Sequence, residues 1–173
     1  MLNKLSFRTD DYGGTREYMV RFAVDIVKAC GERIGFHRAG LRLSPAACLH
    51  EMMGDPRDAE VFESLLKQLN DLPIAYIHKG NFNDKTTFEV LGDKTMTAFM
   101  RSHYRGVLIA CGSYSFDEAA VHIGKKDFDL VAIGRPFIAN PDLIHKLKNK
   151  EALVAYDNQM LGVFYFVIYS GLE

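Results

Sequence analysis

The sequence has no surplus of charge of either sign and no long apolar run, and each absence excludes a class of partner. Its 173 residues include 21 basic and 22 acidic side chains, which gives a net charge of −1. A chain without a strong positive field has little means of attracting nucleic acid, so we expect no nucleic-acid partner. No apolar run reaches the roughly 18 residues of a membrane-spanning helix, so we expect no membrane partner.

Cysteines are few as well. Cys30, Cys48 and Cys111 are odd in number and lack C-x-x-C spacing, which favours reduced thiols over a disulfide frame or a zinc site. The first residues contain no apolar segment of the kind that a secretory signal needs, and we expect a cytoplasmic protein. The histidines do not cluster with metal-ligand spacing, so no metal site is predicted. Only His78, at the end of a predicted strand, is placed to reach a ligand.

What the sequence does contain is an alternation of helical and strand-like stretches over one domain, residues 1–173. Its length and its hydrophobic share of 48% are ordinary for a globular domain. The polar stretch 79–93 is expected to be a loop. Apolar spacing and capping signals predict helices at about 15–32, 56–72, 95–104, 115–124 and 140–148, and strands at 39–45, 74–78, 106–111 and 129–133.

Three local patterns make sharper predictions about these elements. The spacing S-x-x-E from Ser115 to Glu118 predicts a capping box at the start of a helix. The almost wholly apolar strand 106–111 is typical of a parallel strand that is covered on both faces. The first helix is expected to bury one apolar face, which consists of Met19, Phe22, Ala23, Ile26, Val27 and Cys30.

One helix followed by four strand–helix units is typical of an α/β fold with parallel strands. A closed (β/α)₈ barrel has eight strands and typically about 250 residues, so four units are too few to close one. Two architectures stay open at this point, a small open sheet and half of a (β/α)₈ TIM barrel. In either case the unpaired parallel edges need cover.

The first strand contains a charged residue in an unusual place. In the run Gly40–Ser44, a period of two puts Leu41 and Leu43 on one face and Arg42 on the other. In a barrel the leucines would face the helices and Arg42 would point inward, where a guanidinium is costly unless it meets an anion or several acceptors. Two interpretations stay open, a contact with an anionic or polar-ring ligand and a salt bridge to an acidic neighbour.

The last two predicted strands both end in glycine, at Gly112-Ser113 and at Gly134-Arg135. Glycine lets a ligand approach the backbone closely, and backbone N–H groups together with an arginine would suit a phosphate. The loops after the last two strands of a (β/α)₈ barrel are a frequent phosphate site. The alternative is that both glycines lie in ordinary turns at strand ends.

Four stretches, taken together and in order, resemble the old yellow enzyme family of FMN-dependent NADH:flavin oxidoreductases, which are ene-reductases. They are Arg8–Gly14 (RTDDYGG), Gly40–Pro45 (GLRLSP), Ala110–Tyr114 (ACGSY) and Asp129–Asp142 (DLVAIGRPFIANPD). The resemblance covers roughly residues 3–150. It implies that the chain is the C-terminal half of an FMN-binding (β/α)₈ TIM barrel.

The resemblance also implies roles for single residues. Arg42 would lie beside the pyrimidine ring of the flavin, where a positive charge stabilises the anionic reduced form. The residues implied in binding the FMN phosphate are Gly112, Ser113, Gly134 and Arg135. The reductant would be NADH or NADPH, and the small-molecule substrate would be an enone-type activated alkene.

The sequence departs from the family in what it lacks. The family's substrate clamp and tyrosine proton donor would precede Met1, so no catalytic residue is assigned to this chain, and the apolar tail 159–173 is atypical. Three functions therefore stay open. The first is an FMN oxidoreductase completed by a complementary N-terminal half-barrel or by homo-oligomerisation. The second is a non-catalytic truncated fragment, and the third is an interaction module that docks on a full-length relative.

Overall fold

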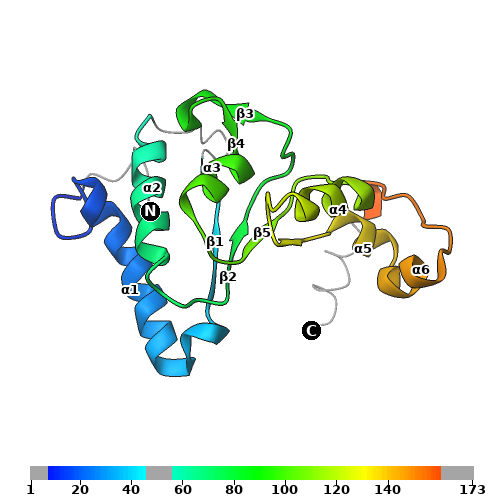
Figure 1. Ribbon diagram of the computed structural model, residues 1–173, viewed down its shortest axis with the longest axis horizontal. Coiled ribbons are helices and arrows are strands. Elements are labelled where there is room, and N and C mark those ends of the chain that lie inside the picture. Colours follow the sequence, from blue (N-terminus) through cyan, green and yellow to red (C-terminus); the bar gives the residue numbers. More distant parts are fainter. Residues whose placement is uncertain (1–7, 46–55, 161–173) are drawn as a thin grey trace, which may run out of the picture. The chain divides into compact units, whose positions relative to one another are not determined.

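The computed structural model describes residues 8–45 and 56–160, which form an α/β fold (Figure 1). Its sheet has four strands in the order β1 (Gly40–Leu43), β2 (Tyr76–Lys79), β5 (Leu108–Ala110) and β6 (Leu130–Val131). All neighbouring strands are parallel. Spatial order follows chain order, so each connection between neighbouring strands is a crossover, and the prediction of an α/β fold with four parallel strands is confirmed.

The chain divides into two compact units between Val131 and Ala132. The first contains the sheet with α1 (Arg16–Ile34), α2 (Asp58–Leu69), α3 (Met96–His103) and α4 (Phe116–Gly124). The second contains α5 (Arg135–Ala139) and α6 (Leu143–Asn149). That the whole chain is one partial domain stays a prediction. Asp55, which directly precedes the predicted helix 56–72, the thiol of Cys48 and positions 161–173 of the apolar tail lie outside the described residues.

Side-chain caps fix where α1, α3 and α4 begin. Thr15 accepts a hydrogen bond from the Tyr18 amide before α1, and Thr95 accepts one from the Ala98 amide before α3. The predicted capping box before α4 is confirmed, because the Ser115 and Glu118 side chains each bond the other residue's backbone.

The stretch 79–93 is more ordered than its polar sequence suggests. It leads into a small antiparallel pair, β3 (Thr87–Phe88) and β4 (Lys94–Thr95), with a 3₁₀ turn, η2 (Glu89–Leu91), between the two strands. Strands of two residues are too short to show a period in the sequence. The turn is anchored because the side chain of Leu91 is buried in the core of the first unit.

The core lies between the sheet and helices α1, α2 and α3, and it occupies one face of the sheet. Leu43, Ile77, Leu108 and Ala110 of the strands belong to it, as do the apolar side chains of α2, which include Leu65, Leu66 and Leu69. The opposite face carries the register partners Arg42, His78, Ile109 and Leu130. Arg42 is exposed there and the side chain of Leu130 is 53% exposed.

Two predictions about burial need correction. Arg42 lies on the face opposite Leu43 as expected, but it is exposed rather than buried, because helices α1, α2 and α3 of the first unit pack on the other face of the sheet. In α1, Met19 and Val27 are buried as expected, whereas Phe22, Ile26 and Cys30 are exposed. Val20 and Val24 are buried instead, because α1 packs on α2 through a face that is rotated from the predicted one.

Two further observations concern the described residues alone. No helix in 8–45 or 56–160 is long and apolar enough to cross a bilayer. Within the same ranges, no three histidine, cysteine, aspartate or glutamate side chains gather as metal ligands.

Replacing Leu66 by alanine tests the location of the core. Leu66 is 0% exposed, so Leu66→Ala should lower the free energy of unfolding by about 2–5 kcal/mol. Ile26→Ala is the matched control, because Ile26 is 45% exposed and its truncation should cost less than about 1 kcal/mol. Urea unfolding followed by circular dichroism measures both, and equal losses would place Leu66 outside the core.

Candidate functional site

The carboxyl ends of β1 and β2 bring Arg42 against a glycine. A Cβ atom added to Gly80 would lie 3.1 Å from Nε and 3.3 Å from Nη2 of Arg42, so the guanidinium rests over the Gly80 backbone. A side chain at position 80 would first meet Oγ of Ser44, which lies closest to that Cβ, and would then press on the guanidinium. The guanidinium is thereby held at the carboxyl end of the sheet, on the open face, and no carboxylate of the described residues is paired with it.

His78 is the register partner of Arg42 and lies on the same face of the sheet. Burial, followed by the positive charges of Arg42 and Lys79, lowers the pKa of His78. The imidazole is therefore neutral at pH 7. Its Nε2 atom is buried and has no hydrogen-bond partner among the described residues. Arg42 is thus the positive charge of this face, and His78 adds a neutral polar atom beside it.

The turn after β5 has an uncommon backbone. Gly112 has φ of 133° and Ser113 has φ of 63°, a left-handed conformation that is uncommon for a residue with a side chain. A Cβ atom on Gly112 would lie 2.7 Å from the backbone nitrogen of Asp84, so only glycine fits. The turn is held in place because the Asp84 amide donates to the Gly112 carbonyl at 3.1 Å and the Ser113 hydroxyl donates to the Phe82 carbonyl at 2.8 Å.

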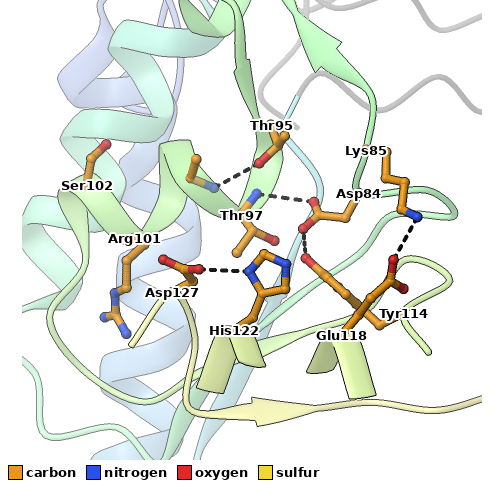
Figure 2. A pocket seen from close by; sticks show the side chains of 11 residues that line it. Asp84, Lys85, Thr95, Thr97, Arg101, Ser102, Tyr114, Glu118, His122 and Asp127 are labelled. Carbon is orange, nitrogen blue, oxygen red and sulfur yellow. Dashed lines mark hydrogen bonds and ion pairs between the residues drawn. The ribbon is translucent and has the colours of Figure 1, made fainter. Parts of the chain in front are cut away.

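A buried ion pair lies directly behind this turn. Lys79 Nζ is 2.5 Å from Asp84 Oδ1, and both side chains are almost completely buried. The other carboxylate oxygen of Asp84 accepts a hydrogen bond from the Tyr114 hydroxyl (Figure 2). Burial lowers the pKa of Lys79 against the attraction of Asp84, and burial together with the bond to Asp84 raises the pKa of Tyr114.

The sequence interpretation missed Lys79, Asp84 and Tyr114. A signal for Lys79 was present, because the period of two that places Ile77 on the buried face of β2 places Lys79 there as well. A lysine on a buried face needs an acid nearby. Asp84 could not be identified as that acid from the sequence, since the pairing depends on the path of the loop.

Cys111 joins the ends of two strands. Its thiol donates to the Lys79 carbonyl at 2.9 Å, and its sulfur lies 3.2 Å from the Asn81 carbonyl. Cys30 and Cys111 are both free thiols, as the sequence predicts for them. The thiol of Cys111 therefore fastens the start of the loop 80–84 to the strand that leads into the Gly112–Ser113 turn.

Gly134 and Arg135 lie in the second unit, at the start of α5. The Gly134 carbonyl accepts from the Phe137 amide at 2.9 Å, and a Cβ on Gly134 would meet no atom within 4 Å. The backbone at Gly134 is thus open to an approaching group. Asn140 does not cap the last helix as predicted. Its buried side chain instead bonds the Pro136 and Val154 backbones, which ties the segment after α6 to α5.

A cavity of about 510 Å³ in the first unit is lined by residues of α3, α4 and the neighbouring loops (Figure 2). Four of its titratable side chains form two pairs within the cavity. Lys85 contacts Glu118 at 2.9 Å, and His122 contacts Asp127 at 2.7 Å. Asp84 and Arg101 are paired with Lys79 and Asp129, which do not line the cavity, so it offers little uncompensated charge to a ligand.

Comparison with known proteins identifies the family. The model of the NADH:flavin oxidoreductase / NADH oxidase family matches residues 1–153. The chain belongs to this family. The resemblance to old yellow enzymes is confirmed, and the parallel sheet with its crossovers is part of the family's (β/α)₈ barrel.

Members of this family with known names or structures are about twice as long as this chain. It is 33% identical over 157 residues to 12-oxophytodienoate reductase 2 of Arabidopsis thaliana, and the aligned region covers 91% of this chain and 42% of that protein. It is 35% identical over 155 residues to a chanoclavine-I aldehyde reductase of Penicillium roqueforti, with shares of 87% and 42%.

Solved structures of the family agree with the fold. Morphinone reductase in complex with tetrahydroNAD aligns with a TM-score of 0.73 at 34% identity, and the match covers 90% of this chain and 40% of that one. The old yellow enzyme homologue of Zymomonas mobilis aligns with a TM-score of 0.75 at 27% identity, with shares of 90% and 43%. The chain thus spans about two fifths of the length of its relatives.

Within this family member, the first unit places Arg42 and the Gly112–Ser113 turn at the same carboxyl edge of the sheet. Their strands, β1 and β5, flank β2. Gly134 and Arg135 are described within the second unit only. The joint site of all five residues therefore stays a prediction.

Alanine substitution of Gly112 and Gly134 tests whether the backbone conformation and close packing at Gly112 require a glycine. Gly112→Ala should lower the free energy of unfolding by about 1–3 kcal/mol, because alanine is strained at positive φ and its Cβ meets the Asp84 backbone. Gly134 has φ of −106° and open surroundings, so Gly134→Ala should cost less than about 1 kcal/mol. Chemical denaturation of both variants is the measurement, and a neutral Gly112→Ala would contradict the geometry of the turn.

Proposed function

We propose that this chain is the flavin-holding part of an ene-reductase of the old yellow enzyme type. The observation that carries the proposal is that the exposed guanidinium of Arg42 and the Gly112–Ser113 turn lie at the same edge of the sheet. The chain that contains them belongs to the NADH:flavin oxidoreductase family. The chemistry that FMN supplies when bound is hydride transfer from NADH or NADPH to the β-carbon of an activated alkene. Relatives named as reductases of 12-oxophytodienoate and morphinone support a substrate that bears an oxo group.

The residues at the strand edge fit the two polar ends of a flavin nucleotide. Arg42 offers a fixed positive charge that stabilises negative charge on the pyrimidine part of the reduced ring. Neutral His78 adds an unpartnered ring nitrogen beside it. Gly112 and Ser113 would offer backbone N–H groups to the phosphate, while the space that a side chain on Gly112 would take is occupied by the backbone of Asp84.

The resemblance to the family also assigns Gly134 and Arg135 to the phosphate, and the structure describes both residues within the second unit alone. The space around Gly134 leaves its backbone open to a phosphate oxygen. Arg135 offers a guanidinium whose planar fork matches a phosphate. The alternative of a non-catalytic fragment has no specific observation in its favour among the described contacts.

We assign no catalytic acid within the described residues, and the relatives to which the chain is similar are about twice as long. The first half of the barrel would supply the groups that are not found here, since a second copy would only repeat the same residues. Spatial strand order follows chain order from β1 onward, so that half would continue the sheet at the β1 edge. Helix α1 precedes β1 in the chain and exposes Tyr18, Phe22 and Ile26, and we propose that the first half of the barrel covers them.

Flavin titration tests the proposed cofactor. Arg42→Ala and Arg135→Ala should each raise the FMN dissociation constant roughly 10- to 150-fold, which corresponds to about 1.5–3 kcal/mol for a hydrogen bond to a charged group. Arg38→Ala is the control, because Arg38 is exposed on the 3₁₀ turn that precedes β1, at the other end of the strand. Binding is followed by quenching of flavin fluorescence, with and without the N-terminal half of Arabidopsis 12-oxophytodienoate reductase 2. A wild-type chain that binds no FMN under either condition refutes the proposal.

A charge on α1 tests the proposed complementation. Phe22→Asp should weaken association with that N-terminal half by at least about tenfold, because the aspartate would have to lose its water against an apolar surface. Val121→Asp on α4 is the matched control, since Phe22 and Val121 are both 54% exposed. Analytical ultracentrifugation gives both association constants. Equal weakening by the two substitutions would remove α1 from the interface.

A further inference from the structure

The buried pair of Lys79 and Asp84 has no role in the proposed function as stated so far. Lys79 is the last residue of β2 and is 0% exposed, and its Nζ lies 2.5 Å from Asp84 Oδ1. Two charges are costly to remove from water, and apolar side chains of similar volume often stabilise a fold as well. The pair therefore calls for an explanation other than stability of the core.

The further contacts of the Asp84 carboxylate lead to two segments, the turn 112–114 and the start of α3. Its second oxygen accepts from the hydroxyl of Tyr114, the residue that follows Ser113 (Figure 2). Lys79 Nζ also lies 5.8 Å from the centre of the Tyr114 ring, within range of a cation–π contact. The Thr97 amide donates to Asp84 Oδ1 at 3.4 Å and connects the carboxylate to the start of α3.

The backbone of Asp84 contacts the turn directly. Its amide donates to the Gly112 carbonyl at 3.1 Å and would lie 2.7 Å from a Cβ on Gly112. The Ser113 hydroxyl is bonded two residues upstream of Asp84, at Phe82. The loop 80–84 and the turn 112–114 are therefore one packed unit, and the ion pair fixes the loop to β2.

We propose that Lys79 and Asp84 are positioning residues that hold the Gly112–Ser113 turn in its left-handed conformation, so that the turn receives the phosphate of a flavin nucleotide. The inference rests on the proposed function and deepens it. Neither side chain touches the phosphate, because both are buried behind the turn. The pair determines preference for the phosphorylated flavin, FMN, over riboflavin, which has the same ring and no phosphate.

The test compares the affinities of FMN and riboflavin, with the complementary N-terminal half present. Asp84→Asn and Lys79→Met should each weaken FMN at least about tenfold and change riboflavin by less than about twofold. Each leaves a buried charge unpaired. The double variant Lys79→Met/Asp84→Asn removes both charges and should recover part of the preference for FMN. A residue that only supports the fold would weaken both ligands together.

Arg101→Met is the matched control. Arg101 Nη1 lies 2.9 Å from Asp129, which also accepts from the Leu108 amide at the amino end of β5, away from the turn. This variant should lower stability and leave the ratio of the two affinities unchanged. If it lowers the ratio as much as Asp84→Asn does, general destabilisation explains the effect and the inference is wrong.

The remaining outcomes separate the inference from the proposed function. A wild-type chain that binds neither ligand contradicts the proposed function. A wild-type chain that prefers FMN, with variants at Lys79 and Asp84 that keep the full preference, contradicts the inference alone. If Asp84→Asn does not fold, Tyr114→Phe decides, because it removes only the hydroxyl bonded to Asp84; an unchanged ratio in that variant overturns the inference.

Discussion

Among the described residues, helices α1, α2 and α3 pack on one face of the parallel sheet, and the rest of the structure depends on this contact. They bury Leu43, Ile77 and Leu108. The opposite face carries Arg42, which is exposed, and Leu130, whose side chain is 53% exposed. His78 lies on that face as well, but its Nε2 atom is buried. Parallel strands are typically apolar on both faces, so a charged arginine on this face of β1 points to a polar role for the face.

The sequence predicts the positions of the helices and strands well, and it predicts less well which of their side chains are buried. All four parallel strands lie within or next to the predicted stretches, and the capping box at Ser115 is where the spacing places it. The burial of Phe22 and Ile26 was predicted wrongly. Periodicity shows which residues of a helix are apolar, and it does not show which neighbour covers them. Here α1 packs on α2 through a face that includes Val20 and Val24, so Phe22 and Ile26 stay exposed.

For the site, the sequence identifies residues whose type is unusual at their position in a strand. Arg42 interrupts an apolar strand and Gly112 ends one, and the structure places both at the carboxyl edge. The sequence did not predict the ion pair of Lys79 and Asp84, because neither residue is unusual at its position. A lysine at a strand end and an aspartate in a polar loop are common on surfaces. Only the fold of the loop over β5 makes them a buried pair.

The proposed phosphate site depends on the backbone of its turns. A phosphate can be held by backbone amides, so the loops that follow the last strands can hold it without catalytic side chains. Glycine has little preference for one backbone conformation, so the conformation of such a turn has to be fixed by contacts with neighbouring residues. In this chain those contacts are the Asp84 amide on the Gly112 carbonyl and the Tyr114 hydroxyl on the Asp84 carboxylate. The buried pair of Lys79 and Asp84 therefore restricts the conformation of the Gly112–Ser113 turn, at the place where an anion is expected to bind.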